Sequence, residues 1–212
     1  MAGIASAEIE RYAEAHTTPP TELQRRQAEE TRETLRSPEM LTGAVEGRLL
    51  EFLVFALEPQ RILELGTYSG YSSLAMASVL PSGGHIDTCE VEPAHAELAR
   101  RYLDEAGVGD RVTIHLGPAL ETVERLEGEF DLIFIDADKS SYPAYYEALV
   151  PRLSSDGIMV LDNTLWSGRV LEPEGSPEAQ MFAELNARIA SDPRVVAVVL
   201  TVRDGVTLVR RA

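Results

Sequence analysis

Three oxygen-bearing side chains and one lysine follow two apolar runs in the second half of the chain. Asp136 and Lys139 come directly after one run, and Asp162 and Asn163 come directly after the next. Carboxylate and amide oxygens, without histidine or cysteine, are the ligands of hard cations such as Mg²⁺, Mn²⁺ or Ca²⁺ rather than Zn²⁺. The three oxygen donors therefore predict a divalent metal site. The alternative is that isolated Asp and Asn residues cap the following helices.

Lys139 is the only lysine among the 19 basic residues of the chain. Arginine stays protonated at any working pH and cannot accept a proton. A lysine close to a divalent cation can have its pKa lowered and then act as a general base. Lys139 is therefore the candidate base, against the alternative of an ordinary surface lysine. The neighbouring Asp138 either faces a cofactor or caps the next helix.

A second chemical signal is the glycine-containing segment RILELGTYSGY, residues 61–71. A short apolar run leads into a loop with Gly66 and Gly70, and a helix follows. This order brings a ligand against backbone N–H groups at the start of a helix. A dinucleotide fingerprint would need glycines where Glu64 and Ser69 stand. The acid suits a ligand that has a cationic end and no pyrophosphate, such as S-adenosylmethionine (SAM).

Other interpretations of this segment remain open. It could be a tight strand-to-helix turn without a ligand, or part of an NAD-binding oxidoreductase or a non-catalytic nucleotide-binding protein. Two further features favour a nucleotide-like ligand. Glu90, about twenty residues after the glycine loop, is placed to accept both ribose hydroxyls. The small residues 117–119 would let a flat adenine lie close.

Apolar periodicity predicts strands that alternate with helices along most of the chain. We expect a core-facing helix over 46–57, strands at 61–65, 85–89, 111–116, 130–135 and 158–161, helices at 71–80, 94–106, 141–152 and 177–190, a short helix ending near 125, and a hairpin of 195–202 with 206–209. Turns are expected at Asp156-Gly157, before strand 158–161, and at Asp204-Gly205 within the hairpin. Strands alternating with helices imply a parallel sheet with right-handed crossovers. Residues 1–36 are predicted to form a polar helical extension that acts as a substrate lid, a dimer contact or both, and 37–212 to form the main domain. The extension either packs on this domain or on a second subunit, or is solvated.

The composition limits the partners of the protein. With 212 residues and 44% hydrophobic composition, the chain can bury one sizeable core. A net charge of −16 argues against nucleic acid as a partner. A single cysteine, Cys89, fits a reducing compartment, and no signal peptide or membrane-length apolar run is visible. We therefore expect a cytoplasmic protein that does not bind membranes.

These motifs together resemble the small metal-dependent O-methyltransferases of the caffeoyl-CoA O-methyltransferase type, which are related to catechol O-methyltransferase. The likeness runs from about Pro38 to the C-terminus and rests on residues 64–72, 117–120, 134–139 and 162–166. It implies a class I fold, an α/β Rossmann-like, seven-stranded and mostly parallel sheet flanked by helices, with a C-terminal antiparallel hairpin. It also implies SAM as methyl donor, a divalent cation and a homodimer.

The resemblance assigns roles to individual residues. It places Thr42, Glu64, Gly66, Thr67, Ser72, Glu90, Ala119 and Asp138 at SAM; Asp136, Asp162 and Asn163 at the metal; Lys139 as the base beside Asp136; and Trp166 and Ser167 at the substrate. Ser167 replaces an asparagine of the plant enzymes. Their basic N-terminal residues, which meet CoA phosphates, have no counterpart in residues 1–36. A small catechol-type aromatic (catechol, hydroxycinnamate or flavonoid) is therefore the expected methyl acceptor, with a metal-independent methyltransferase as the alternative.

Overall fold

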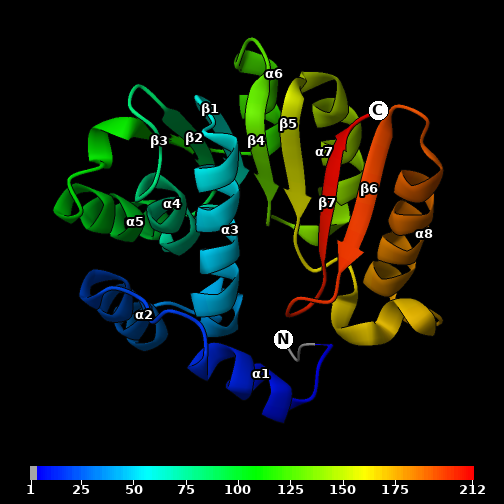
Figure 1. Cartoon of the computed structure of the whole chain (residues 1–212), viewed down its shortest axis with the longest axis horizontal. Coiled ribbons are helices and arrows are strands. Elements are labelled where there is room, and N and C mark those ends of the chain that lie inside the picture. Colours follow the sequence, from blue (N-terminus) through cyan, green and yellow to red (C-terminus); the bar gives the residue numbers. More distant parts are fainter. Residues whose placement is uncertain (1–3) are drawn as a thin grey trace. The chain divides into compact units, whose positions relative to one another are not determined.

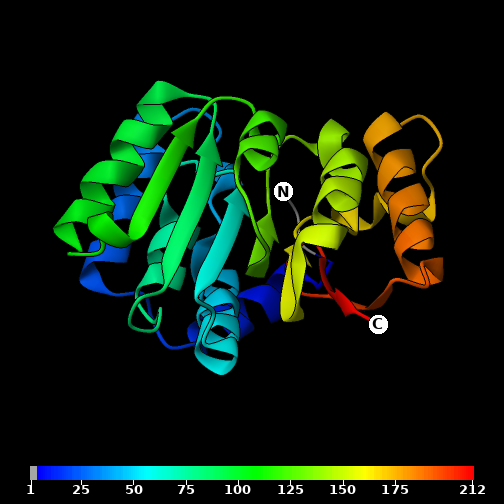
Figure 2. The same ribbon diagram turned by 90° about the horizontal axis from the view of Figure 1, so that it is seen from above.

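The computed structural model describes residues 4–212. These residues form two compact units, one made of 4–10 with 128–212 and the other of 11–127. Each unit contains its own set of β-strands with helices against it (Figures 1 and 2). The first helix of the described chain is α1 (Ala7–Ala15).

The unit of residues 11–127 is built on three parallel strands. In its order β3-β2-β1, β2 (His85–Glu90) pairs with both β1 (Arg61–Leu65) and β3 (Val112–Leu116). Its helices are α2 (Glu22–Thr34), α3 (Gly43–Leu57), α4 (Tyr71–Ala77), α5 (Pro93–Glu105) and α6 (Ala119–Arg125), with short 3₁₀ turns at Pro38–Met40 and Gly109–Arg111. Helices α4, α5 and α6 all contact β2. Four of the five residues of β1 are buried, as expected for a parallel strand covered on both faces.

The other unit has a mixed sheet with the order β4-β5-β7-β6. Strand β4 (Phe130–Ile135) is parallel to β5 (Leu153–Leu161), whereas β7 (Val206–Arg211) is antiparallel to β5 and to β6 (Val195–Leu200). Its helices are α7 (Tyr142–Leu149) and α8 (Pro177–Ser191), with 3₁₀ segments Lys139–Ser141, Val150–Arg152 and Trp166–Leu171. The predicted C-terminal antiparallel hairpin is confirmed.

Two element boundaries differ from the sequence prediction. Helix α7 ends at Leu149 rather than 152, and a 3₁₀ turn follows, because Pro151 has no N–H to continue the helical hydrogen bonds. Strand β5 begins at Leu153 rather than 158. It runs through the expected turn at Gly157, where the pairing with β4 shifts register. A Cβ on Gly157 would lie 3.0 Å from the carbonyl oxygen of Asp131, so this position needs a glycine.

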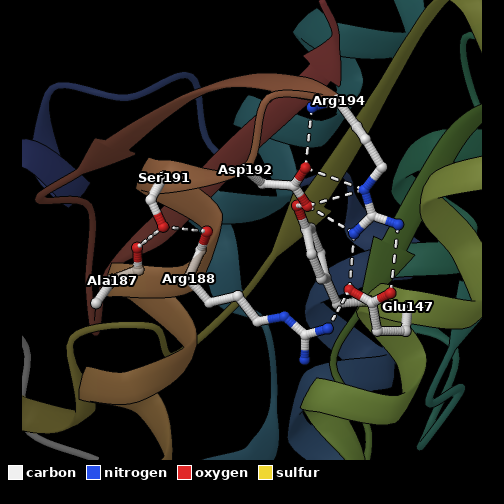
Figure 3. Close-up of polar contacts among 7 residues, drawn as sticks. Glu147, Ala187, Arg188, Ser191, Asp192 and Arg194 are labelled. Atoms are coloured by element: carbon white, nitrogen blue, oxygen red, sulfur yellow. Dashed lines mark hydrogen bonds and ion pairs between the residues drawn. The ribbon is translucent and has the colours of Figure 1, made fainter.

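A polar cluster joins three elements of this second unit (Figure 3). Glu147 of α7 forms ion pairs with Arg188 of α8 at 2.6 Å and with Arg194 at 2.7 Å. Arg194 also pairs with Asp192 at 2.6 Å. The hydroxyl of Tyr146 donates to Oδ2 of Asp192 at 2.9 Å. The cluster therefore ties α7 and α8 to the start of β6.

Among residues 4–212, no helix is both long enough and apolar enough to cross a membrane.

Candidate active site

The glycine loop is bent tightly between β1 and α4. Gly66 and Gly70 have φ angles of 99° and 82°, which favour glycine. The N–H groups of Gly66 and Thr67 donate to the carbonyl oxygen of Cys89 at 3.1 and 3.0 Å. A Cβ on Gly70 would lie 2.7 Å from Cβ of Ala99 in α5. The two glycines therefore let the loop pack closely against β2 and α5.

Glu64 lies fully buried beneath this loop. Its carboxylate accepts hydrogen bonds from the hydroxyls of Ser72 and Ser73 and, at 2.6 Å, from Thr88. The hydroxyl of Thr88 also lies 2.6 Å from that of Thr67. The structure thus brings the predicted residues Glu64, Thr67 and Ser72 together. Ser73 and Thr88 were not predicted, because only the folded chain shows which hydroxyls reach the carboxylate.

Glu90 is held by backbone N–H groups. Its Oε2 accepts from the N–H of Tyr68 at 2.7 Å, and its Oε1 accepts from those of Val91 and Glu92, both at 2.9 Å. The residue is 7% exposed. The carboxylate is therefore fixed in one orientation at the end of β2. Tyr68, which the sequence analysis did not single out, has a φ of 47° that aims its N–H at Glu90.

The remaining predicted cofactor residues of this unit are also buried. Ala119, at the start of α6, is 8% exposed, and the N–H of nearby Gly117 donates to the carbonyl oxygen of Glu90 at 2.8 Å. This bond joins the end of β3 to the end of β2. Thr42 is 6% exposed and directly precedes α3. Its assignment to the cofactor still rests on the resemblance alone.

Helix α2 packs onto the glycine loop and α5. The side-chain amide of Gln27 donates to the carbonyl oxygen of Ser69 at 2.7 Å. Glu30 accepts from the hydroxyl of Tyr102 at 2.7 Å and pairs with Arg101. Of the interpretations left open for this helix, packing on residues of its own unit is therefore observed. A role of residues 1–36 as a substrate lid or dimer contact stays a prediction.

In the unit that contains β4 and β5, Lys139 pairs with a predicted ligand. Its Nζ donates to Oδ1 of Asp136 at 2.7 Å and to the hydroxyl of Tyr142 at 3.2 Å. The side chains of Lys139 and Asp136 are 19% and 18% exposed. The hydroxyl of Tyr142 in turn donates to the carbonyl oxygen of Ile135 at 3.0 Å. Lys139 is thus a partly buried, fixed lysine, and Tyr142 is a partner that the sequence analysis missed.

Asp138 bonds to side chains rather than to a helix end. Its carboxylate accepts from the hydroxyl of Tyr145 and, at 3.3 Å, from that of Ser140. It makes no capping bond to the 3₁₀ segment that follows. The capping interpretation of Asp138 is therefore wrong, whereas its contact with a cofactor stays a prediction.

Asp162 and Asn163 are buried at the end of β5, 4% and 5% exposed. Oδ1 of Asp162 accepts from the N–H of Asn163 at 2.7 Å. Burial raises the pKa of Asp162, and the negative charge of Asp136 raises it further, while the positive charge of Lys139 opposes this shift. The Oδ1 atom of Asn163 is buried and accepts no hydrogen bond.

These features fit a hard cation. A buried amide oxygen without a donor is unfavourable, and burial disfavours the charged form of a carboxylate. A nearby cation would compensate for both. Asp136, Asp162 and Asn163 supply the oxygen ligands that Mg²⁺ or Mn²⁺ prefers. Among residues 4–212, no group of three or more His, Cys, Asp or Glu side chains is placed to hold a metal. Asp136, Asp162 and Asn163 differ from such a group, because they combine two carboxylates with an amide.

Trp166 and Ser167, the predicted substrate residues, lie in the loop that follows Asn163. The Trp166 ring packs against Phe182 of α8 at 5.3 Å between centroids, and its Nε1 is buried without a partner. The N–H of Ser167 donates to the carboxylate of Asp204. Burial raises the pKa of Asp204. The sequence analysis treated Asp204 only as a turn residue, because nothing local indicates that it reaches this loop.

The mostly parallel strands flanked by helices, with an antiparallel C-terminal pair, are those of a class I methyltransferase, and comparisons with known proteins specify the family. A sequence profile described as O-methyltransferase matches residues 14–212. Caffeoyl-CoA O-methyltransferase 1 of Eucalyptus globulus is 36% identical over 184 residues, 81% of this chain and 75% of the relative. The probable caffeoyl-CoA O-methyltransferase 1 of Dictyostelium discoideum is 31% identical over 207 residues, covering 94% and 90%.

Solved structures agree with these relatives. The SAH-bound methyltransferase PaMTH1 of Podospora anserina matches with a TM-score of 0.89 and 32% identity, over 97% of this chain and 94% of that one. The O-methyltransferase TomG of Streptomyces achromogenes, in complex with SAM, matches with a TM-score of 0.87 and 29% identity, over 97% and 96%. The chain belongs to the O-methyltransferase family of methyl-transferring enzymes and is of the caffeoyl-CoA O-methyltransferase type. The predicted fold class and resemblance are confirmed.

Proposed function

We propose that this enzyme transfers a methyl group from SAM to one hydroxyl of a vicinal diol on a small catechol-type aromatic, with a divalent cation. The observation that carries the proposal is the arrangement at the ends of β4 and β5. There, the only lysine of the chain bonds to Asp136, and the buried pair Asp162 and Asn163 retains an amide oxygen without a partner.

The methyl donor is assigned to the glycine loop and the end of β2. SAM and SAH are bound by TomG and PaMTH1, to which this chain is similar. Glu90 is oriented by three backbone N–H groups, and the remaining lone pair of its Oε2 can accept a ribose hydroxyl. Glu64, Gly66, Thr67 and Ser72, in and beneath the glycine loop, are assigned to the methionine part. Thr42 and Ala119 complete the proposed set of this unit, and the assignment of Asp138 to the cofactor rests on the family resemblance.

The acceptor is assigned to Asp136, Lys139, Asp162, Asn163, Trp166 and Ser167. A divalent cation held by Asp136, Asp162 and Asn163 would orient both diol oxygens and lower the pKa of the attacking hydroxyl. Lys139 is assigned to take the proton of that hydroxyl at Nζ. Asp136 and the hydroxyl of Tyr142 then hold the ammonium that forms. Because the methyl group is already activated on a sulfonium, the protein needs no covalent intermediate and mainly positions the two reactants.

The partners follow from charge. A net charge of −16 disfavours nucleic acid and the phosphates of a CoA thioester, so a small aromatic without phosphate is the proposed acceptor.

We also propose a homodimer. On α3, Phe52 and Phe55 are each 70% exposed, as expected for a surface that another protein covers. Light scattering of the wild type and of the double variant Phe52→Ser/Phe55→Ser tests this, since a dimer through α3 would dissociate in the variant.

The decisive experiment measures transfer of a labelled methyl group from SAM to catechol, caffeate, a catechol flavonoid and caffeoyl-CoA. Each acceptor is tested after chelation with EDTA and after addition of Mg²⁺ or Mn²⁺. We expect methylation of the phosphate-free catechols, loss of activity with EDTA and recovery with the metal. Asp156→Asn, on an exposed part of β5, is the matched control and should retain activity. Full activity in EDTA would instead indicate a metal-independent methyltransferase.

A further inference from the structure

The loop that carries the acceptor residues, 163–168 (the acceptor loop), has an unfavourable backbone. The φ angles of Asn163, Trp166, Ser167 and Gly168 are 61°, 46°, 53° and 77°. Side-chain-bearing residues rarely adopt positive φ, and for a residue as large as tryptophan it is a genuine outlier. Such strain persists only where the surrounding structure imposes it. The partners of the loop therefore identify what holds it.

The turn between β6 and β7 supplies these partners. The N–H of Thr164 donates to the carbonyl oxygen of Gly205 at 3.0 Å, and that of Leu165 to the carbonyl oxygen of Asp204 at 3.0 Å. The N–H of Ser167 donates to the side chain of Asp204. A Cβ on Gly205 would lie 2.7 Å from the nitrogen of Leu165. The turn thus contacts the acceptor loop at three successive points, from Thr164 to Ser167.

Asp204 differs from an ordinary turn aspartate. Such residues are usually exposed to water, but Asp204 is 4% exposed and its Oδ2 is buried without a hydrogen-bond partner. Burying a carboxylate is unfavourable unless its hydrogen bonds are strong. The bond from the N–H of Ser167 to this carboxylate is charge-assisted and is therefore one of the stronger contacts of the loop.

We propose that Asp204 is a positioning residue, which acts through the N–H of Ser167 to hold the acceptor loop so that Asn163 can bind the metal and Trp166 and Ser167 can receive the acceptor. The inference rests on the proposed function. Asp204 touches neither reactant. Its effect is on metal affinity and on KM for the acceptor, not on the binding of SAM.

The test compares Asp204→Ala and Asp204→Asn with the wild type and with the exposed control Asp156→Asn. Mn²⁺ affinity is measured by electron paramagnetic resonance, and KM for the best catechol is measured with saturating metal. Trp166 is the only tryptophan of the chain, so acrylamide quenching of its fluorescence reports on the loop without any assay of activity. SAM affinity is measured by calorimetry.

For Asp204→Ala we expect about tenfold weaker Mn²⁺ binding, the size of effect seen when an outer partner of a metal site is removed. We also expect a higher KM and stronger quenching of Trp166, with unchanged SAM affinity. Asp204→Asn should lie between, because its amide oxygen can still accept from Ser167. If Asp204→Ala does not fold, Asp204→Asn decides alone, through shifts in the same direction.

Wild-type Mn²⁺ affinity, KM and quenching in the folded variants, with only a lower melting temperature, would overturn the inference. This result differs from a failure of the proposed function. In that case the wild-type protein itself would bind no Mn²⁺ and show no metal-dependent methyl transfer, while the quenching of Trp166 would still test whether Asp204 holds the loop.

Discussion

Two aspartates of the same unit have opposite surroundings. Asp192 accepts from the guanidinium of Arg194 and from the hydroxyl of Tyr146, and these donors, Arg194 above all, hold its pKa below the usual range. Asp162 is more deeply buried, lies near the negative charge of Asp136, and has a raised pKa. The first aspartate is satisfied by the chain itself (Figure 3). The second is buried with a raised pKa, and buried acids with perturbed pKa values are typical of functional sites.

The same contrast separates the lysine from the arginines. Lys139 and Arg194 each pair with an aspartate, but only a lysine can lose its proton. The Arg194 cluster joins α7 and α8 to β6 and needs permanent charge. The Lys139 pair includes Asp136, one of the proposed metal ligands, and lies where the proposed reaction needs a proton acceptor.

The largest expected effect comes from exchanging these two cations. Lys139→Arg keeps the positive charge but removes the base, so kcat should fall by about 10²–10⁴-fold. Steady-state kinetics with SAM and the best catechol measure this. The converse change, Arg194→Lys, is the control and should leave kcat unchanged. A Lys139→Arg enzyme with the turnover of the wild type would show that another group accepts the proton.

Asp162→Asn should separate activity from stability. Metal affinity should fall by more than the roughly 10–100-fold that loss of an outer partner causes, and activity should fall with it. Because the folded-state pKa of Asp162 is raised, the folded protein holds a proton that the unfolded chain has lost. The stability of the metal-free protein therefore decreases as pH rises from about 4, the ordinary Asp pKa, through the raised value.

The Asp162→Asn variant should lack this loss of stability with rising pH. It should therefore melt a few degrees higher than the wild type at pH 7 in EDTA. The melting temperatures of the variant and the wild type are compared by circular dichroism from about pH 4 to about pH 8. A metal-free variant that melts below the wild type at neutral pH would contradict an unsatisfied carboxylate at this position.

Asp192→Asn is expected to have the smallest effect on activity and the opposite effect on stability. The lowered pKa of Asp192 stabilises the folded protein above the ordinary Asp pKa of about 4, and this contribution is lost as pH falls toward the lowered value. The variant should melt a few degrees lower at pH 7 and keep kcat and metal affinity. Large losses of activity would show that the cluster of Figure 3 supports the site.

Much of the candidate site could be predicted because its residues stand at or just after the ends of strands, which can be recognised in the sequence. Glu64, Gly66 and Glu90 follow or end β1 and β2, and Asp136 and Asp162 follow β4 and β5. In a parallel sheet the carboxyl ends of the strands face the ligand, so residue type and position along the chain were enough to select them. The fold class could be predicted because apolar runs that form strands alternate with helices along the chain.

The partners of these residues could not be predicted, since they depend on contacts between distant segments. Thr88 reaches Glu64 across 24 residues, and Asp204 reaches Ser167 across 37. The early start of β5 likewise depends on its pairing with β4, which overrides the local turn signal at Gly157.

The sequence by itself determined which chemical groups this protein possesses at its strand ends: a glycine loop with an acid beneath it, two aspartates, an asparagine and a single lysine. Only the tertiary structure decided the pKa values, hydrogen-bond partners and backbone angles of these groups. Burial raises the pKa of Asp162 and leaves Asn163 Oδ1 without a donor, and the β6–β7 turn contacts an acceptor loop that has positive φ angles. Desolvation and hydrogen-bond partners are set by packing, which a linear pattern of residues does not specify.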